Sequence, residues 1–228
     1  MPSTVPRLNK SALQLYLVFG PQDLLAGQTA IGLIEQAVAG GVTCVQWRDK
    51  TALSQASLDQ RADHLRPIQD GARALGMPFL INDDVALAKT LKADGVHLGQ
   101  DDLAPDQARR ELGDQAIIGW SVGTAIERQR LDDLLAVDAL MVDYIGVGPA
   151  FPTGTKADAG AALGAEGINA VLAGATLPAV AIGGISQKNC KLLKLTTAVG
   201  IAVVSAIAGQ SDPKQAAKQL FAEMHGQG

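Results

Sequence analysis

The chain has 228 residues, of which 47% are hydrophobic, 18% charged and 4% aromatic, and its formal net charge is −4. This composition is that of a globular protein, and the absence of any Lys/Arg run excludes the electrostatic footprint of a nucleic-acid or anionic-membrane binder. The first residues contain no apolar signal core and no stretch reaches the roughly 18 apolar residues of a membrane helix, which predicts a cytoplasmic location.

Eight short apolar runs alternate along the chain with eight stretches of helical spacing. Most of the runs lack polar–apolar alternation, which is typical of parallel strands that are covered on both faces. The predicted strands are residues 13–19, 42–47, 78–81, 95–98, 116–120, 142–148, 178–183 and 200–204. The predicted helices are residues 29–41, 57–76, 85–93, 104–112, 125–136, 164–175, 186–196 and 212–225.

This alternation of strands and helices predicts a closed (β/α)8 TIM barrel. We expect a single domain over residues 1–228, with residues 1–12 as an N-terminal extension. The alternative is an open, doubly wound sheet, but no GxGxxG sequence follows the first strand to support it. In a barrel the functional residues lie at the carboxyl ends of the strands, so the polar residues that follow each apolar run are the candidates for a site.

The second predicted strand ends in Gln46-Trp47-Arg48-Asp49-Lys50. Strand alternation turns Gln46, Arg48 and Lys50 towards one side, where they form a donor-rich set suited to an anion. The alternative is a strand end that becomes a charged surface turn, because Lys and Arg are common at surfaces.

The third and fourth predicted strands both end in acidic residues. Asn82-Asp83-Asp84 follows the third strand and Asp101-Asp102 follows the fourth, so a barrel brings the two clusters to one rim. Carboxylates beside an anion site indicate Mg²⁺, which is commonly held by one or two carboxylates together with substrate phosphates. The alternative is helix N-capping, since both clusters precede helical stretches. We expect one acid of each pair to serve the helix and the other to serve the site.

Small residues and hydroxyls follow the sixth, seventh and eighth predicted strands. The sixth leads into the Gly/Thr/Lys loop of residues 148–156, the seventh into Gly183-Gly184, and the eighth into Val204-Ser205. Backbone amides in such loops can approach a phosphate, and the loops after strands seven and eight are the usual phosphate site of a barrel. Tight turn geometry alone would also explain the glycines. The sequence therefore predicts a neutral anion region in addition to the basic one.

Three further residues carry little functional signal. Cys44 and Cys190 belong to no CxxC pair or metal-ligand spacing, so we expect two reduced structural thiols. His97 lies within a predicted strand without Glu or Cys at metal spacing, which favours a packed or hydrogen-bonded residue over a zinc ligand.

Seven blocks of the chain, in this order, resemble the thiamine-phosphate synthase family. They are QWRDK, INDDVALA, ADGVHLGQDDL, GWSVGT, VDYIGVGPAFPTGTK, AIGGIS and GIAVVSAI, and they span nearly the whole chain. The resemblance implies condensation of 4-amino-2-methyl-5-(diphosphooxymethyl)pyrimidine with 4-methyl-5-(2-phosphooxyethyl)thiazole on a (β/α)8 barrel that uses Mg²⁺. The products would be thiamine phosphate and diphosphate. The C–O bond would ionise first and the thiazole nitrogen would trap the resulting cation, so the leaving group needs stabilisation more than the reaction needs a base.

The resemblance also implies roles for individual residues. Arg48, Lys50, Lys156 and Ser121 would be catalytic, and Asp83 and Asp102 would bind Mg²⁺. The pyrimidine diphosphate would be bound by Gln46, Arg48, Lys50, Asn82, Ser121 and Lys156. The thiazole phosphate would be bound by Thr153, Gly154, Thr155, Gly184, Val204 and Ser205. Asp84 and Asp101 are left to capping or to support of the metal ligands.

Two positions depart from the family pattern. The first strand runs into Phe19-Gly20-Pro21-Gln22-Asp23 where Thr-Asp is usual, and Trp120 precedes Ser121. Both could reshape the pyrimidine pocket. Competing functions are a thiazole tautomerase, which shares the barrel but forms no C–N bond, and a regulatory barrel that only binds phosphate. The retained acids and bases favour the synthase, with small-molecule substrates, no nucleic-acid or membrane partner, and a homo-oligomer left open.

Overall fold

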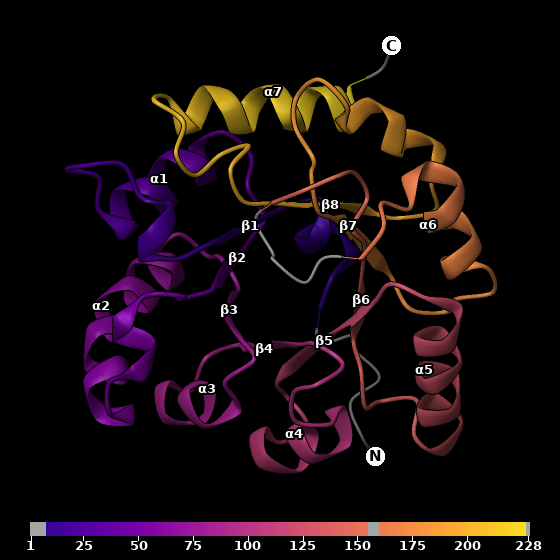
Figure 1. The fold of residues 1–228 in the computed structure, drawn as a ribbon. Coiled ribbons are helices and arrows are strands. Elements are labelled where there is room, and N and C mark those ends of the chain that lie inside the picture. Colours follow the sequence, from indigo (N-terminus) through magenta and orange to yellow (C-terminus); the bar gives the residue numbers. More distant parts are fainter. Residues whose placement is uncertain (1–7, 155–159, 227–228) are drawn as a thin grey trace.

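The apolar runs form eight parallel strands that pair in chain order and close into a barrel when β8 pairs with β1 (Figure 1). This computed structural model describes residues 8–154 and 160–226. The predicted (β/α)8 barrel is confirmed. The strands are β1 (Leu15–Phe19), β2 (Cys44–Trp47), β3 (Phe79–Asn82), β4 (Gly95–Leu98), β5 (Ile117–Val122), β6 (Tyr144–Val147), β7 (Ala179–Ile182) and β8 (Gly200–Val203).

Seven α-helices of the described residues surround the barrel (Figure 1). They are α1 (Ala30–Ala39), α2 (Leu58–Ala74), α3 (Val85–Leu91), α4 (Pro105–Leu112), α5 (Ala125–Val137), α6 (Gly164–Leu172) and α7 (Pro213–His225). Several begin where the sequence supplies a capping side chain, such as Thr29 before α1 and Ser57 before α2. Among the described helices none has both the length and the apolar character needed to cross a bilayer.

The helix predicted over residues 186–196 is wrong in type, because this crossover contains a 3-10 helix, η4 (Cys190–Leu195). The side chain of Asn189 accepts a hydrogen bond from the Ser186 amide and donates one to the Gly184 carbonyl, which holds the start of the segment as a turn. The buried residues Cys190 and Leu193 are three positions apart, a spacing that a 3-10 helix also satisfies.

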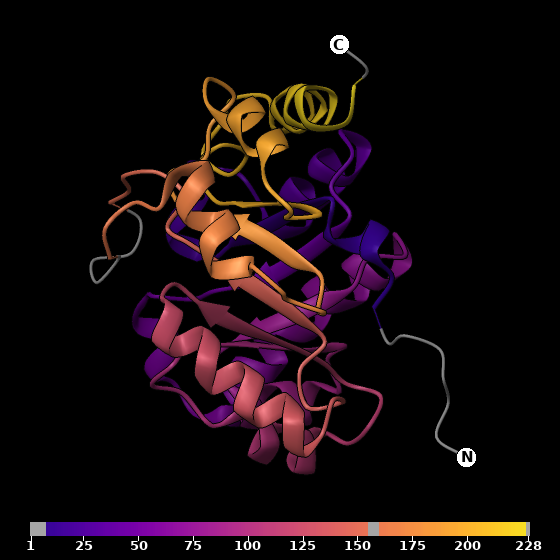
Figure 2. The same cartoon turned by 90° about the vertical axis from the view of Figure 1, so that its right-hand side faces the viewer.

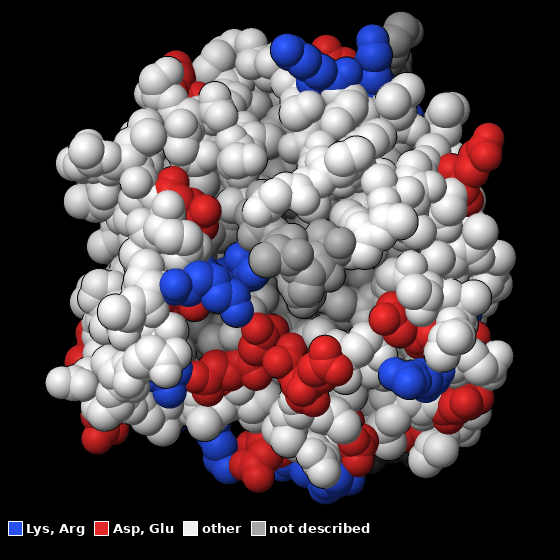
Figure 3. Space-filling model, viewed as in Figure 1, with Lys and Arg blue, Asp and Glu red and all other residues white. Residues whose placement is uncertain are grey.

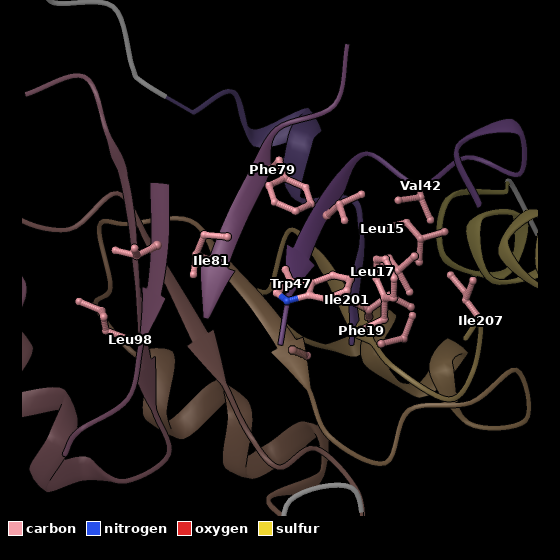
Figure 4. Packing of buried hydrophobic residues seen from close by; sticks show 14 of the residues in the cluster. Leu15, Leu17, Phe19, Val42, Trp47, Phe79, Ile81, Leu98, Ile201 and Ile207 are labelled. Atoms are coloured by element: carbon pink, nitrogen blue, oxygen red, sulfur yellow. The ribbon is translucent and has the colours of Figure 1, made fainter. Parts of the chain in front are cut away.

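Each strand buries both of its faces, one against the helices and one inside the barrel. In β1 the alternate residues Leu15, Leu17 and Phe19 belong to the outer core, and Tyr16 and Val18 belong to the interior. Figure 4 shows the outer core from close by, including the edge-to-face contact of Phe19 with Trp47. This two-sided burial explains why the strands read as continuous apolar runs.

The amino ends of the strands are closed by the segment before β1. A short 3-10 helix, η1 (Lys10–Leu13), lies at the end of the barrel opposite the β6–α6 connection, as the side view in Figure 2 shows. Leu8 and Leu13 are buried in the same cluster as Tyr16 and Tyr144 of the barrel interior. The closed amino end leaves the carboxyl ends of the strands as the open mouth of the barrel.

A buried ion pair ties α4 to the strands beside it. The Nη2 of Arg109 lies 2.8 Å from the Oδ2 of Asp143, and the two side chains are only 9% and 10% exposed. The same carboxylate oxygen accepts a hydrogen bond from the Ile118 amide, and Arg109 donates to the Ala116 carbonyl. Because Asp143 immediately precedes β6, this pair fixes the amino ends of β5 and β6 rather than the mouth.

Asp143→Ala is therefore expected to lower the free energy of unfolding by about 3 to 5 kcal/mol, because it removes a buried carboxylate that lies 2.8 Å from the buried Arg109 guanidinium. Urea denaturation measures the loss. Glu111→Ala is the matched control, since the Lys89–Glu111 pair is 58% and 53% exposed and its removal should change the stability far less. Equal losses in the two variants would contradict the role given to Arg109 and Asp143.

Candidate functional site

The predicted acidic and basic residues meet at the mouth of the barrel, over β2, β3 and β4. Figure 3 looks onto the carboxyl ends of the strands and shows Lys and Arg side chains directly beside a group of Asp and Glu side chains near the centre of this face. Lys50 and Asp83 form an ion pair across the two groups, with their Nζ and Oδ2 atoms 3.7 Å apart. Residues that are 33 positions apart in sequence thus form one charged site.

The segment after β2 is placed as its alternation predicts. Gln46 is buried inside the barrel at 3% exposure, Arg48 is half-buried and Lys50 is exposed at the rim. The Arg48 amide donates to the Phe19 carbonyl, which continues the β1–β2 pairing one residue beyond β2. The three side chains therefore rise from the interior to the rim along one edge of the mouth.

The unusual segment after β1 holds this basic segment in place. It forms a 3-10 turn, η2 (Pro21–Asp23). The Gln22 side chain donates through Nε2 to the Arg48 carbonyl at 2.8 Å and accepts through Oε1 from the Lys50 backbone amide at 3.0 Å. Gly20 permits this approach, because a Cβ atom there would lie 2.1 Å from the Arg48 carbonyl oxygen. The Phe19–Asp23 departure thus supplies a brace for the backbone that carries Arg48 and Lys50.

Asp83 combines backbone strain with an unfavourable charge. Its φ angle is +63°, a left-handed conformation that is uncommon outside glycine, and its amide donates to the His97 carbonyl of β4. Burial, followed by the hydrogen bond to Asp102 and the negative charge of Asp102, raises its pKa to about 6, although Lys50 and Arg48 oppose the rise. The fold therefore brings the two predicted metal ligands into contact.

The loop that carries Asp102 is braced from both sides. The Asp102 carboxylate accepts from the Gly99 amide at 2.6 Å, and the Trp120 indole donates to the Gly99 carbonyl at 3.1 Å. Trp120 itself packs in the outer core, outside the barrel wall. The second departure from the family pattern therefore lies away from the pocket and supports the acidic loop from behind.

The helix-capping role expected of one acid in each pair is confirmed for Asp84 only. Asp84 caps α3 by accepting from the Leu87 amide, and it also pairs with Arg61 of α2. Asp101 does not cap α4, whose N-cap is Ala104 without a side-chain hydrogen bond. Capping by Asp101 was wrong because Pro105 begins the helix further along the chain, and a proline at this position has no amide hydrogen to satisfy.

The donor set of the acid pair fits a hard divalent cation. Asp83 and Asp102 present carboxylate oxygens only, and the described residues contain no group of three or more His, Cys, Asp or Glu side chains arranged for a metal. Mg²⁺ suits such an open site, because it keeps several waters and takes further oxygens from substrate phosphates. A cation would also offset the burial and the negative charge of Asp102 that together raise the pKa of Asp83.

A cavity of about 400 Å³ adjoins the charged site. It opens between the segment after β2, which includes the 3-10 helix η3 (Ala52–Gln55), and the start of α3. Its wall combines apolar and charged side chains, namely Trp47, Asp49, Lys50, Leu53, Ser54, Gln55, Arg61, Leu65, Ile81, Asn82, Asp83, Asp84 and Leu87. Asn82, Lys50 and Asp83 therefore border both this cavity and the mouth.

The neutral side of the mouth lies at the ends of β6, β7 and β8. Gly184 has a φ angle of +63°, and a Cβ atom there would lie 2.5 Å from the carbonyl oxygens of Phe151 and Pro152. The loop after β6 therefore packs directly on Gly184 and carries Thr153 and Gly154 to this side. After β8, the Val204 carbonyl accepts hydrogen bonds from the Ile207 and Ala208 amides, so Ser205 lies in a turn. Thr155 and Lys156 lie outside the described residues.

Ser121 is connected to the barrel interior through His97. The Nε2 of His97 lies 2.9 Å from the Ser121 Oγ, and its Nδ1 lies 2.9 Å from the Tyr144 hydroxyl. The prediction that His97 is a hydrogen-bonded residue is confirmed. Sequence reasoning missed Tyr16 and Tyr144, which looked like core residues in apolar runs, although a buried tyrosine hydroxyl generally requires a partner.

Comparison with known proteins gives one consistent result. A family model described as thiamine monophosphate synthase matches residues 15–207. The thiamine-phosphate synthase of Azorhizobium caulinodans is 44% identical over 208 residues, which are 91% of this chain and 93% of the relative. That of Xanthobacter autotrophicus is 46% identical over 210 residues, covering 92% of this chain and 94% of the relative.

The solved structures agree with these relatives. Thiamine phosphate pyrophosphorylase from Pyrococcus furiosus superposes with a TM-score of 0.77 at 29% sequence identity, covering 95% of this chain and 99% of that one. A structure described as native KDPGal superposes with a TM-score of 0.63 at 16% identity, which shows only that it has the same fold.

Asp83→Asn is expected to stabilise the metal-free protein, because it removes a repelled charge and because asparagine tolerates a left-handed backbone. The charge penalty in the wild type is absent below the ordinary aspartate pKa of 3.8 and complete above a pH of about 6. The gain should therefore grow as pH rises through this window and reach about 2 °C or more in the unfolding midpoint. Thermal melts in EDTA at pH 4 and pH 7.5 measure it. An unchanged midpoint at pH 7.5 would contradict the repulsion.

Gln22→Ala is expected to loosen the backbone of Arg48 and Lys50, because the Gln22 side chain then no longer donates to the Arg48 carbonyl or accepts from the Lys50 amide. Binding of inorganic diphosphate in the presence of Mg²⁺, measured by calorimetry, should weaken by about 10-fold, the equivalent of about one or two hydrogen bonds. Gln28→Ala is the control, since Gln28 lies in the same connection between β1 and α1 and its side chain accepts from the Leu25 amide. Similar affinities for the two variants would exclude Gln22 as a brace.

Proposed function

The chain belongs to the thiamine monophosphate synthase family, and we propose that the charged and the neutral side of its barrel mouth each bind one of the two substrates. The activity is that of a transferase that forms thiamine phosphate. The proposed substrates are a pyrimidine diphosphate at the charged side, over β2 to β4, and a thiazole phosphate at the neutral side, over β6 to β8. The observation that carries the proposal is the contact of Lys50 with Asp83 beside Asp102.

The charged side matches the needs of a diphosphate that must be both bound and released. Arg48 and Lys50 supply positive charge on one edge, and the brace from Gln22 fixes their backbone. Asn82 adds a neutral amide at the end of β3, beside Asp83. We assign the pyrimidine ring to the more interior part of the mouth, where Gln46 and Ser121 lie.

Mg²⁺ is the proposed cofactor, held by Asp83 and Asp102 together with diphosphate oxygens. When bound, the cation neutralises charge on the diphosphate and makes it a better leaving group. Asp102 is presented by the loop that Gly99 and Trp120 brace, and Asp83 is presented by a strained backbone. Two carboxylates that repel each other in the free protein are thereby set to gain from a shared cation.

The proposed chemistry breaks one bond and forms one. The C–O bond between the pyrimidine methylene and the diphosphate breaks, and the electron pair leaves with the diphosphate. The thiazole nitrogen then supplies its lone pair to the methylene carbon and becomes a quaternary cation, so no proton needs to be removed. Arg48 and Lys50 act by stabilising negative charge that grows on the leaving group, which is why the described mouth needs no Ser/His nucleophile couple.

The neutral side suits a phosphate monoester that stays attached to its ring. Gly184, together with Val204 and Ser205, offers backbone amides at the ends of β7 and β8, and Thr153 and Gly154 approach from the loop after β6. Thr155 and Lys156 complete the proposed set, Lys156 on the diphosphate. A neutral cradle holds the thiazole phosphate without competing for the Mg²⁺ that serves the diphosphate.

A tautomerase or a purely regulatory barrel explains less of the structure. Either would use the neutral cradle, but neither would need Arg48, Lys50 and the pair of Asp83 and Asp102 in one site. The two carboxylates beside Arg48 and Lys50 suit a bound cation and a polyphosphate, which the synthase reaction requires and the other two functions do not.

Asp102→Asn is expected to lower kcat/KM for thiamine phosphate formation by about 100-fold or more, because it removes a charged ligand of the proposed cation. Asparagine keeps an oxygen that can accept from the Gly99 amide, so the unfolding midpoint should change little. Asp101→Asn is the matched control, since Asp101 is the exposed neighbour in the same loop. Product formation from both substrates across a Mg²⁺ titration measures the effect. Near-normal turnover of Asp102→Asn at low Mg²⁺ would overturn the metal assignment.

A further inference from the structure

A chain of hydrogen bonds crosses the interior of the barrel below the mouth. It runs from the Gln46 Nε2 to the Tyr16 hydroxyl at 2.7 Å, from Tyr16 to the Tyr144 hydroxyl at 3.0 Å, and from Tyr144 to the His97 Nδ1 at 2.9 Å. It ends at Ser121, whose Oγ lies 2.9 Å from the His97 Nε2. The chain thus joins β2 to β5, which lie three strands apart on the barrel, through residues of β1, β6 and β4.

The barrel wall is hollowed to make room for this chain. A Cβ atom at Gly119 of β5 would lie 2.2 Å from the Tyr144 ring, and one at Gly146 of β6 would lie 2.7 Å from the His97 ring. Glycine in a strand interior is otherwise unfavourable, because it weakens the strand and packs no side chain. Two strands therefore give up side chains to seat the two rings.

The order of the protons along the chain follows from its Gln46 end. An amide nitrogen can only donate, so the Tyr16 oxygen accepts from the Gln46 side chain. The Tyr16 hydroxyl hydrogen is then available to donate to the Tyr144 oxygen. Burial raises the pKa of both tyrosines well above its ordinary value, so both keep their hydrogens. In that direction Tyr144 donates to the His97 Nδ1, and His97, with its hydrogen on Nε2, donates to the Ser121 Oγ.

We propose that Tyr16, Tyr144 and His97 are positioning residues that fix Gln46 as a hydrogen-bond acceptor and Ser121 as a hydrogen-bond donor towards the pyrimidine. The bond to Tyr16 uses the Gln46 nitrogen and leaves its oxygen to face the substrate. Ser121 receives the His97 hydrogen and keeps its own to donate. This inference rests on the proposed function, because it takes Gln46 and Ser121 to contact the pyrimidine.

The fixed direction selects between related pyrimidines. A 4-aminopyrimidine offers an amino donor beside a ring-nitrogen acceptor, which matches an accepting Gln46 and a donating Ser121. The 4-oxo analogue offers an acceptor and a ring N–H donor in the same places, which reverses both requirements. Because the chain is buried and its members bond one another, neither end can reverse its role without reversing every hydroxyl and the histidine tautomer.

The histidine tautomer tests the proposal directly in the wild-type protein. The polypeptide has only 3 histidines, so its His97 signals can be resolved by long-range proton–nitrogen NMR of protein labelled with ¹⁵N-histidine. The His97→Asn variant assigns these signals. A neutral ring with its hydrogen on Nε2 at pH 8 is the expected result. A hydrogen on Nδ1, or a doubly protonated ring, would overturn the proposed direction whatever the enzyme's activity.

Tyr144→Phe breaks the chain at its centre and keeps the ring. We expect kcat/KM for the aminopyrimidine diphosphate to fall by about 10- to 100-fold through loss of alignment, while the Kd for the thiazole phosphate stays within about 2-fold. The preference for the aminopyrimidine diphosphate is the ratio of the inhibition constant of the 4-oxo analogue to the KM of the amino substrate. In Tyr144→Phe this ratio should fall by about 10-fold. An unchanged preference would exclude a positioning role.

Gln69→Leu controls for the loss of a buried hydrogen bond elsewhere. Gln69 of α2 is 1% exposed and donates to the Lys92 carbonyl, outside the barrel interior. It should lower the unfolding midpoint as Tyr144→Phe does, yet leave the pyrimidine preference unchanged. A narrowed preference in Gln69→Leu would show that Tyr144→Phe acts through stability alone.

A double variant separates this inference from the proposed function. If Tyr144 acts through Ser121, Tyr144→Phe combined with Ser121→Ala should lose much less than the product of the two single losses, and multiplicative losses would contradict the link. Failure of the wild type to make thiamine phosphate would refute the proposed function but would leave the tautomer result standing. The two ideas can therefore fail separately.

Discussion

In each of the eight short strands of the closed barrel, successive side chains point alternately into and out of the barrel, and the site depends on this alternation. Inside the barrel every second residue faces its neighbours across a narrow space, so polar side chains there must bond one another or reach the mouth. Gln46 and His97 satisfy the first condition below the rim, and Arg48 and Lys50 satisfy the second above it. The intervening residues, such as Val45 and Trp47, face outward and build the core against the helices. One repeat thus produces both the core and a site layered by depth.

Charge is concentrated at the mouth, where the fold tolerates it at some loss of stability. Asp83 is held in a left-handed conformation beside Asp102, and its pKa is raised first by burial and then by the contact with Asp102. The buried pair of Arg109 and Asp143, by contrast, lies towards the amino ends, where its charges are matched. Backbone strain and two adjacent carboxylates at one end and a buried ion pair at the other are the distribution expected when the first end binds a ligand and the second holds the fold.

Most of the fold and the charged residues of the site could be predicted because they depend on local patterns. Apolar runs marked all eight strands, and the polar residues after them marked the rim. The 3-10 helix η4 was misread because its three-residue spacing also fits an α-helix. The Gln22 brace could not be predicted, since it joins backbone 26 residues away through one side chain. Tyr16 and Tyr144 were hidden because an aromatic residue in an apolar run looks like core until its hydroxyl partner is known.

The two sides of the reaction place different demands on positioning, and the structure meets each with a different device. A diphosphate needs charge at roughly the right distance, so a braced backbone and flexible Arg48 and Lys50 side chains are sufficient, and a cation can take up the remaining freedom. A neutral ring offers no net charge to attract, so its orientation depends on which atoms donate and which accept. Only a buried chain of fixed direction can hold that choice, since a water-exposed Gln46 or Ser121 could rotate freely. On this proposal, burial of Tyr16 and Tyr144 serves recognition of the pyrimidine as well as packing.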